Sequence, residues 1–396
     1  MKKILFIYPH MLLGGSTTSL LSLMNSLDPS KYQVDLQLKS NTGLLLNDIP
    51  DHVRLLPEAQ KYTGRAGRII KGARFVFQGG AFKALWVNAK NKRKGFAPAV
   101  MTEFQVKQFS RKNKNHYDYA IGFLEGWSNS YLAYNVDADK KYAWLHSTFA
   151  NITQDPESQL PWMKKVDKIA LVTDACTEDF KKTLPSMADK AITIENITDS
   201  SIIRKRSESV DETDEMYVRY VEADCFKIVT VCRITIDIKG LDRIVSCAKN
   251  LKNKGERFLW YIIGNGKDED ALKAMIAEAG VEDCLVPIGV RFNPYAFVKE
   301  ADIMCMPSRY EGRPMVITES MILGVPPVVT EYLAAHEQIK NGVEGIIVKN
   351  EDDSIEEAVH MCISNPQIVS GMRDYLKSTE YGNSCYINEI EKKLFK

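Results

Sequence analysis

The sequence lacks most of the features that would place it outside ordinary globular proteins. Its longest apolar runs, such as Ile4 to Tyr8 and Val325 to Val329, are far shorter than the ~20 residues of a membrane-spanning helix. The eight cysteines include no C-x-x-C pair, so neither a disulfide framework nor a zinc site is indicated, and we expect reduced core residues. The N-terminus soon turns polar and glycine-rich, which favours a buried first strand over a secretory signal and therefore a cytoplasmic protein.

Length and composition predict more than one domain. The chain has 396 residues, which exceeds what a single hydrophobic core usually organises. Hydrophobic residues make up 45% of the chain and charged residues 26%, as in soluble globular proteins. Short apolar runs rich in β-formers alternate with helix-period segments almost throughout, which is typical of α/β proteins with parallel sheets.

Acidic residues are missing from one segment. Between Ala59 and Thr102 there are ten Lys or Arg and no Asp or Glu, which leaves a net charge of −9 for the rest of a chain that carries +1 overall. Apolar and aromatic residues interrupt these cations, a mixture typical of a surface that lies on an anionic membrane. A solvated basic face is the alternative; nucleic-acid binding is a third, and no recognised nucleic-acid module accompanies the segment. The expected membrane or acceptor patch comprises Arg65, Arg68, Lys71, Arg74, Trp86, Lys92, Arg93 and Lys94.

Two series of strands can be predicted, one on each side of a polar, acidic stretch at 196–224. The first series comprises Ile4 to Tyr8, Val34 to Leu38, Tyr119 to Phe123, Tyr142 to Leu145, Ile169 to Val172 and Ala191 to Ile194. The second comprises Lys227 to Val231, Leu259 to Ile263, Val286 to Ile288, Ile303 to Met306, Pro327 to Thr330 and Ile346 to Val348. The domain boundary is therefore expected near 196–199. The last residues, from Ser384, can form an amphipathic helix.

A glycine turn follows the first predicted strand. Gly14 and Gly15 are followed by four hydroxyl residues and then by apolar residues at helical spacing. This places the N-terminus of a helix at the carboxyl end of a parallel strand, where open α/β sheets bind ligands. The pattern is not G-x-G-x-x-G, so a dinucleotide is not indicated, and a plain tight turn is the alternative.

Two cations follow the first strand of the second series. Arg233 ends that strand and Lys239 comes six residues later, at an expected helix start. An arginine fork and a mobile lysine can together clamp a diphosphate. Taken alone the pattern is weak, because surface cations after a strand are common.

The string from Pro307 to Gly324 is the most informative motif. Proline at 314 and glycine at 324 predict a helix from Met315 to Leu323, whose first N–H groups can bind phosphate or sugar oxygens. Glu311 lies in the loop before this helix and Glu319 in its second turn. Ionised carboxylates are pure acceptors and suit the paired O–H donors of a sugar diol.

Together these motifs resemble those of retaining glycosyltransferases of family 4, which have the GT-B fold. The matching elements, in chain order, are Gly14-Gly15, Trp144-Leu145-His146, Arg233 with Lys239, Gly264-Asn265-Gly266, and Glu311-x7-Glu319. The resemblance covers nearly the whole chain and is sharpest from Lys227 to Val348. It implies two Rossmann-like domains that face each other across a cleft. Residues 1–198 would bind the acceptor, residues 199–380 would bind the nucleotide sugar, and residues 381–396 would form a helix that returns to the first domain.

The resemblance also implies a role for each matching residue of the second domain. Arg233 and Lys239 would hold the donor diphosphate and stabilise the leaving nucleotide. Glu311 would hydrogen-bond the donor sugar, and Glu319 the ribose hydroxyls.

Further implied contacts come from backbone groups and from the first domain. The amides of Met315 and Val316 would bind the sugar or a phosphate, and the base would lie against the backbone near Arg291. His146 would lie beside the sugar near the transferring carbon. The Gly14-Gly15 loop would approach donor and acceptor from the other domain.

The expected activity is transfer of a sugar, with retention, from a nucleotide diphosphate donor, first of all a UDP-sugar. The acceptor would be a hydroxyl of a lipid-linked or saccharide molecule in cell-surface polysaccharide synthesis, at the inner face of the membrane. No metal or other cofactor is expected: Asp137-Ala138-Asp139 spells a D-x-D, but we expect it in a surface turn. The alternatives are a GT-B nucleotide-sugar epimerase and a non-catalytic partner subunit.

Overall fold

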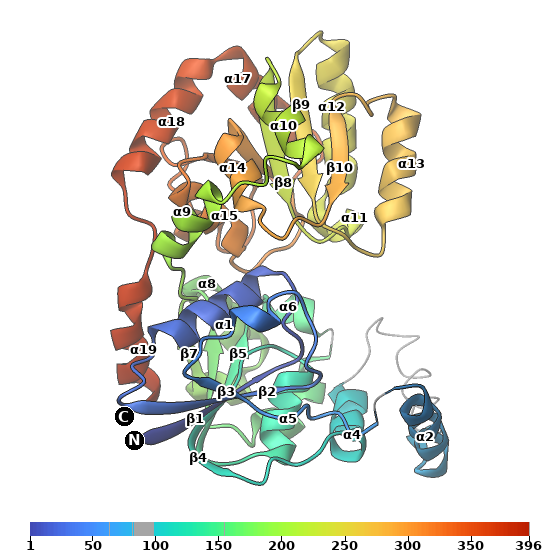
Figure 1. Ribbon diagram of the computed structural model, residues 1–396, viewed down its shortest axis with the longest axis vertical. Helices are drawn as coiled ribbons and strands as arrows, with labels where there is room; N and C mark the ends of the chain where they lie inside the picture. Colours follow the sequence, from blue (N-terminus) through green and yellow to red (C-terminus); the bar gives the residue numbers. More distant parts are fainter. Residues whose placement is uncertain (63, 81, 83–98, 154, 396) are drawn as a thin grey trace. The chain divides into compact units, whose positions relative to one another are not determined.

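The structure of the protein is a computed structural model, which describes residues 1–62, 64–80, 82, 99–153 and 155–395. These residues form two compact units, Met1–Ile197 with Cys385–Lys396 and Thr198–Ser384 (Figure 1). Each unit has one parallel β-sheet with helices packed on it, as the alternation of strands and helices predicts.

The described residues of the first unit form a seven-stranded parallel sheet. In order across the sheet, the strands are β3 (Val53–Leu55), β2 (Tyr32–Leu38), β1 (Lys2–Tyr8), β4 (His116–Gly122), β5 (Asp137–Leu145), β6 (Lys168–Leu171) and β7 (Ala191–Thr193). The helices are α1 (Gly15–Ser26), α2 (Gly64–Phe77), α4 (Ala99–Phe109), α5 (Trp127–Asn135), α6 (Phe149–Ile152), α7 (Leu160–Met163), α8 (Asp174–Thr183) and α19 (Ile387–Leu394), with 3-10 turns at Leu46–Asp48, Pro156–Gln159, Pro185–Lys190 and Ser384–Tyr386.

The six strands predicted in the first series are all present. The apolar run of β1 is central in the sheet, and Ile4 to Ile7 are fully buried, as expected for a strand covered on both faces. The short strand β3 was not predicted. It has only three residues, of which Val53 alone is buried, so it gives no pattern of its own in the sequence.

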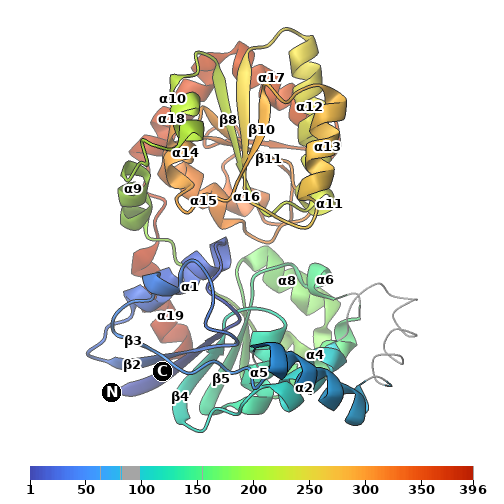
Figure 2. The ribbon, with the colours of Figure 1, turned by 45° about the vertical axis from the view of Figure 1, so that its right-hand side comes forward.

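Helix α19 completes the core of the first unit. Ile390 and Leu394 are buried there, and the hydroxyl of Tyr142 donates to the carbonyl of Leu394 at 2.7 Å. The ring of Phe395 packs 5.5 Å from that of Tyr32, centroid to centroid. Figures 1 and 2 both show α19 close to the N-terminal strand. The amphipathic pattern predicted from Ser384 onward is therefore a helix whose apolar side is buried.

The second unit, as described, has a six-stranded parallel sheet. Its order is β10 (Leu285–Gly289), β9 (Phe258–Ile263), β8 (Phe226–Val231), β11 (Ile303–Met306), β12 (Pro327–Thr330) and β13 (Ile346–Val348). The helices are α9 (Ser200–Glu208), α10 (Glu215–Glu222), α11 (Ile236–Lys239), α12 (Leu241–Asn253), α13 (Glu269–Ala279), α14 (Tyr295–Glu300), α15 (Met315–Ile322), α16 (Ala335–Gln338), α17 (Ser354–Ser364) and α18 (Pro366–Ser378).

Every strand of the second predicted series is confirmed. Successive residues of β9 point to opposite faces: Trp260 and Ile262 enter one core cluster and Tyr261 and Ile263 the other. The polar stretch before β8 is largely helical, because it forms α9 and α10.

The cysteines agree with the expectation of reduced residues. All eight are free, and five of them are buried. Three depart from the predicted core placement: Cys225 and Cys232 are partly buried, and Cys385 is exposed where the chain returns to the first unit.

Candidate functional site

The strand order of the second sheet locates a ligand site. The order of its first four strands is β10-β9-β8-β11, so the sheet grows in one direction from β8 and then in the other from β11. Ligands of such sheets bind outside the carboxyl ends of the strands at this switch point. The loop after β8 carries Arg233, and the loop after β11 carries Glu311.

Three glycines let the loops at this edge pack closely. A Cβ atom on Gly264 would lie 1.9 Å from the carbonyl oxygen of Cys232, and one on Gly266 would lie 2.0 Å from that of Ile234. Gly240 has φ +63°, and its Cβ would lie 2.1 Å from the carbonyl oxygen of Pro307. The glycines at 264 and 266 therefore seat the Arg233 loop, and Gly240 holds the end of α11 against the loop that follows β11.

Lys239 and Glu311 form an ion pair at this edge. Lys239 is the last residue of the single turn α11, and its Nζ lies 2.5 Å from Glu311 Oε1. Burial opposes the lysine charge, but attraction to Glu311 outweighs it, and the pKa of Lys239 is raised. Arg233 is exposed, and no hydrogen bond or ion pair within the described residues engages its guanidinium. The site therefore combines a paired cation with one that can take an anionic ligand.

Helix α15 supplies further donors. It begins at Met315 after Pro314 and ends at Ile322, one residue short of the predicted end. Among the described residues, no backbone hydrogen bond uses the N–H groups of Met315 and Val316. Gln338 donates to the Pro314 carbonyl at 2.9 Å and so steadies the start of the helix. An unfilled helix N-terminus at the site favours a negatively charged group.

Glu319 lies in the second turn of α15 and is 7% exposed. The Tyr295 hydroxyl donates to its Oε1 at 3.2 Å. Burial raises the pKa of Glu319 to about 7, although the Tyr295 bond and the charge of Arg206 act in the opposite direction. Glu319 therefore gains or loses its charge near neutral pH.

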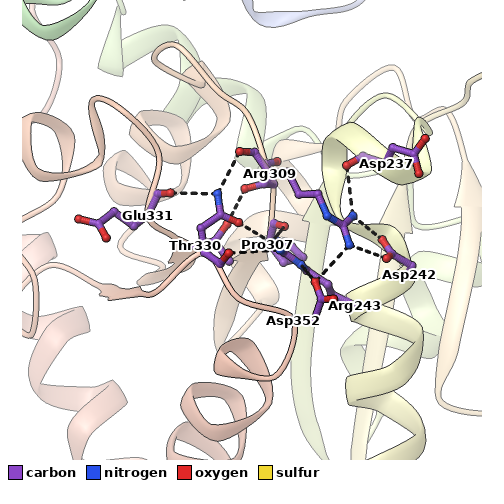
Figure 3. A network of polar contacts seen from close by, with 10 residues as sticks. Asp237, Asp242, Arg243, Pro307, Arg309, Thr330, Glu331 and Asp352 are labelled. Atoms are coloured by element: carbon purple, nitrogen blue, oxygen red, sulfur yellow. Dashed lines mark hydrogen bonds and ion pairs between the residues drawn. The ribbon is translucent and has the colours of Figure 1, made fainter.

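Arg309 is a residue of this site that the sequence analysis did not single out. It lies between the end of β11 and Glu311, and it forms two parallel bonds to the Asp242 carboxylate at 2.8 and 2.6 Å (Figure 3). Its backbone N–H donates to the carbonyl of Ile238 at 2.9 Å, and its guanidinium donates to that of Asp237 at 3.2 Å. Arg309 therefore ties the Glu311 loop to the turn that carries Lys239.

Arg243, on α12, also anchors the loop that carries Glu311. Its side chain is 4% exposed, and it donates to Asp352 at 2.8 Å, to Pro307 O at 3.2 Å and to Asn350 at 2.7 Å. Asn350 in turn donates to the carbonyl of Arg309 at 3.0 Å. Figure 3 shows this network, whose residues come from α12, the loop after β11 and the loop after β13. Buried arginine networks of this kind hold loops in one geometry.

Arg291 has a structural partner. Its Nε lies 2.7 Å from the carboxylate of Asp214, the N-cap residue of α10. The guanidinium is thus directed to α10, and only the backbone at this position stays available for the predicted base contact.

The first unit has its own switch point, between β1 and β4. Gly14 precedes α1 and Gly15 is its first residue, and the Tyr8 hydroxyl lies 2.6 Å from Ser16 Oγ. His146 follows β5, the next strand along the sheet, so Gly14, Gly15 and His146 all lie at the carboxyl edge. Burial lowers the pKa of His146, against the opposing effect of Glu125.

Comparisons with known proteins point to one family of glycosyltransferases. Residues 221–381 match the family model described as Glycosyl transferases group 1. The match spans 161 of the 396 residues. The chain is 33% identical over 148 residues to the amylovoran biosynthesis glycosyltransferase AmsK of Erwinia amylovora, an alignment that covers 35% of this chain and 36% of that protein. It is 30% identical over 136 residues to the putative colanic acid biosynthesis glycosyltransferase WcaL of Salmonella typhimurium, over 32% of this chain and 33% of that one.

The chain thus spans about a third of the length of these relatives, whereas the structural similarity to glycosyltransferases extends over nearly the whole chain. HepE of Anabaena, solved with UDP-glucose, aligns over 99% of both chains with a TM-score of 0.68 and 14% identity. WaaG, a glycosyltransferase involved in lipopolysaccharide biosynthesis, aligns over 99% of both chains with a TM-score of 0.63 and 15% identity. The predicted GT-B fold class is therefore confirmed.

The D-x-D of the first unit is not in a turn, contrary to expectation. Asp137 and Asp139 begin β5, because β4 pairs with it in parallel from His116 onward. The His116 ring lies 3.0 Å from Asp137 and 3.2 Å from Asp139. This cluster is at the amino end of the strand whose carboxyl end leads to His146. Across the described ranges, no group of three or more His, Cys, Asp or Glu is placed to hold a metal ion.

Only part of the basic segment is described. Arg65, Arg68, Lys71 and Arg74 are positions of α2, whereas Trp86, Lys92, Arg93 and Lys94 lie outside the described residues. Helix α2 packs on α4 through Phe75, whose ring lies 6.0 Å from that of Phe104. Other large apolar side chains nearby are exposed, namely Ile69, Ile70, Val76, Phe77 and Phe82. In the part of the chain that the structure describes, no helix is long and apolar enough to cross a bilayer.

Proposed function

We propose that this protein transfers a sugar from a nucleotide diphosphate donor to a hydroxyl acceptor, with retention of configuration. The observation that carries the proposal is the exposed guanidinium of Arg233, which no described residue engages, beside the Lys239–Glu311 pair at the switch point of the second sheet. A diphosphate carries the charge and the oxygen geometry that an arginine fork and a lysine recognise.

The same groups account for the chemistry. As the bond between sugar and diphosphate breaks, negative charge grows on the leaving phosphate. Arg233, Lys239 and the N-terminus of α15 are fixed donors that stabilise this charge, and preorganised stabilisation of this kind usually contributes more to catalysis than any other effect. We include no metal ion, because side chains supply the cations that the leaving group needs.

The remaining roles follow from the same arrangement. Glu311 bonds Lys239 through Oε1, and we assign its other oxygen to a hydroxyl of the donor sugar. Glu319 accepts from the ribose diol, and Met315 and Val316 donate to the sugar or a phosphate. His146 and the Gly14-Gly15 loop contribute from the first unit, beside the transferring carbon.

The first donors to examine are UDP-sugars, because the neighbouring structure of HepE was solved with UDP-glucose. Thermal unfolding should be followed with UDP, GDP, ADP and their sugar conjugates, since a specific ligand stabilises the native state according to its occupancy. One nucleotide series should raise the midpoint in the wild type, and this increase should be lost in Arg233→Ala and Glu319→Ala. Arg257→Ala is the matched control, because Arg257 is exposed at the amino end of β9.

If no nucleotide stabilises the wild type, the transferase proposal fails. Consumption of the nucleotide sugar without any acceptor would instead favour epimerisation or hydrolysis.

For the acceptor, we propose a lipid-linked intermediate of a cell-surface polysaccharide, which is consistent with relatives named for amylovoran and colanic acid biosynthesis. Helix α2 supports a position at an anionic membrane. Ile70, Arg74 and Phe77 share a face at helical spacing, and Phe77 is 89% exposed. Exposed apolar side chains within a segment of ten cations and no acid match an anionic interface.

Sedimentation with vesicles tests this part separately. The protein should bind vesicles that contain phosphatidylglycerol and not vesicles of phosphatidylcholine alone. The double variant Ile70→Ser and Phe77→Ser should bind less, and high salt should weaken binding of the wild type. Equal binding to both vesicle types, or none to either, would exclude the membrane proposal and leave the transferase proposal intact.

A further inference from the structure

The loop between β4 and α5 holds His146 at two points. The backbone N–H of His146 donates to Glu125 Oε2 at 3.0 Å. The ring nitrogen Nε2 of His146 lies 3.0 Å from the carbonyl oxygen of Phe123, which precedes Glu125 by two residues. The other carboxylate oxygen of Glu125 accepts from the Ser147 hydroxyl at 2.8 Å. Residues 123–125 therefore fix both the backbone turn at 146–147 and the imidazole that it carries.

The location of this loop points to a functional role. It follows β4, which lies beside β1 across the switch point of the first sheet. Glu125 thus stands between the strand that leads to Gly14 and the strand that leads to His146, at the edge where a ligand is expected. The sequence analysis did not include this glutamate, because no motif surrounds it.

The other surroundings of the imidazole are aromatic. The ring of Phe123 lies 4.8 Å from it and that of Trp144 lies 6.3 Å from it, centroid to centroid. Among the described residues, the carboxylate of Glu125 is the charged group that acts on His146. A charged group in such surroundings has a large effect on the pKa of its neighbour, since little solvent screens the charge.

We propose that Glu125 is a positioning residue, which fixes the backbone turn at His146 so that the ring keeps its bond to the Phe123 carbonyl and Nδ1 faces the substrate. The proposal rests on the transferase function proposed above. It adds a residue on the acceptor side of the reaction, where none had been assigned besides His146 and the glycine loop.

The tautomer follows from the hydrogen bond to Phe123. A carbonyl oxygen can only accept, so Nε2 must carry the proton in the neutral ring. Nδ1 then has a lone pair and can accept from a hydroxyl of the sugar or of the acceptor. Burial, the largest influence, lowers the pKa of His146 and favours this neutral form, while Glu125 acts in the opposite direction.

The first experiment is an NMR titration of the His146 Cε1 proton, assigned with His146→Gln. It requires no turnover, so it remains informative whether or not the donor has been found. In Glu125→Gln, His146 should titrate at lower pH than in the wild type, because the nearby negative charge is lost. In Glu125→Asp the negative charge is kept, but the side chain is shorter by one methylene and the charge lies farther from the ring. The pKa of His146 in this variant should therefore fall between those of the wild type and Glu125→Gln. Glu178→Gln, on α8 of the same unit, is the control and should leave it unchanged.

Steady-state kinetics with the donor found by thermal shift provide the second measurement. We expect kcat of Glu125→Gln to fall by about 10- to 100-fold, since a small displacement of a reacting group costs that much. The KM for the nucleotide sugar should stay within about twofold, because the contacts assigned to the nucleotide and its diphosphate lie in the second unit. The acid limb of the kcat profile should move to lower pH, in parallel with the titration.

An unchanged His146 titration in Glu125→Gln would overturn the proposal. If kcat fell without that shift, Glu125 would have only a structural role in the fold. If Glu125→Gln does not fold, the same criterion applies to Glu125→Asp. A wild type that binds no nucleotide contradicts the transferase function, whereas the titration still decides whether Glu125 acts on His146.

Discussion

The two units build the carboxyl edges of their sheets in different ways. In the second unit, Arg309, Glu311 and Glu319 belong to one continuous string, and a network of arginines and carboxylates fastens that string to the turn of Lys239. In the first unit, the residues around His146 come from loops far apart in the chain, and Glu125 reaches it from 21 residues away. A continuous motif can thus bring together the residues at the carboxyl edge of one sheet, while the corresponding edge of the other sheet depends on tertiary contacts between distant loops.

The largest expected effect comes from breaking the Lys239–Glu311 pair. Lys239→Ala removes a proposed diphosphate contact and leaves the Glu311 carboxylate, 12% exposed, without its partner. We expect nucleotide affinity to fall at least about 100-fold and the second unit to lose about 3 kcal/mol of unfolding free energy. Calorimetric titration and urea unfolding measure the two effects. Lys273→Ala, which breaks an exposed pair with Glu269, should cost no more than about 0.5 kcal/mol.

A glycine substitution tests whether the close packing of two loops determines the position of the Lys239 turn. Gly240→Ala places a Cβ 2.1 Å from Pro307 O at a positive φ, so the turn of Lys239 must move, at a cost of about 3 kcal/mol. Gly280→Ala has a similar φ of +68° but nothing within 4 Å of its Cβ, and should cost about 1 kcal/mol. Equal losses in urea unfolding would show that strain, and not the approach of the two loops, matters at position 240.

The matching test in the first unit is Leu394→Ala. This side chain is 1% exposed in the core of that unit, and its truncation should cost about 2 to 3 kcal/mol. Amide hydrogen exchange should become faster in the first unit, which loses stability, and should stay unchanged in the second unit. Lys392→Ala on the same helix, where the side chain is exposed, should change stability by less than about 0.5 kcal/mol.

The smallest expected effect is a pH dependence of nucleotide binding. With a pKa of about 7, Glu319 is ionised above neutral pH and protonated below it. If Glu319 binds the ribose diol as proposed, the affinity of the protein for the nucleotide should fall as the pH drops from 8 to 6, by about tenfold per unit below the pKa. Glu319→Gln should bind more weakly and with little pH dependence. An identical slope in the wild type and this variant would assign the effect to another group.

The same group contributes to stability with the opposite trend. Because the folded-state pKa of Glu319 is raised above its ordinary value of 4.5, the native state binds the extra proton between about pH 4.5 and 7. The unfolding free energy of the wild type should therefore decrease as pH rises through this window, and Glu319→Gln should lack that contribution.

Sequence reasoning succeeded where the information is local. The apolar runs gave twelve strands that the structure confirms, and Pro314 with Gly324 gave α15 to within one residue. It missed β3, which is too short to show a pattern, and it placed Asp137 in a turn although parallel pairing with β4 makes it a strand residue. Glu125 could not be found, because its importance comes from a fold that brings two distant loops together. Arg309 was visible within the motif, but only its bonds to Asp242 reveal what it does.

The return of α19 to the first unit has a consequence for how the protein is made. The second unit is an insertion within the first, and its ends are tied together by bonds of 2.7 and 3.0 Å between Thr198 and Asn383. During synthesis, every residue of the second unit leaves the ribosome before Ile390, Leu394 and Phe395 do. The unit that starts first therefore finishes its core last. A nascent chain halted before α19 should already hold a folded second unit together with an unfinished first one.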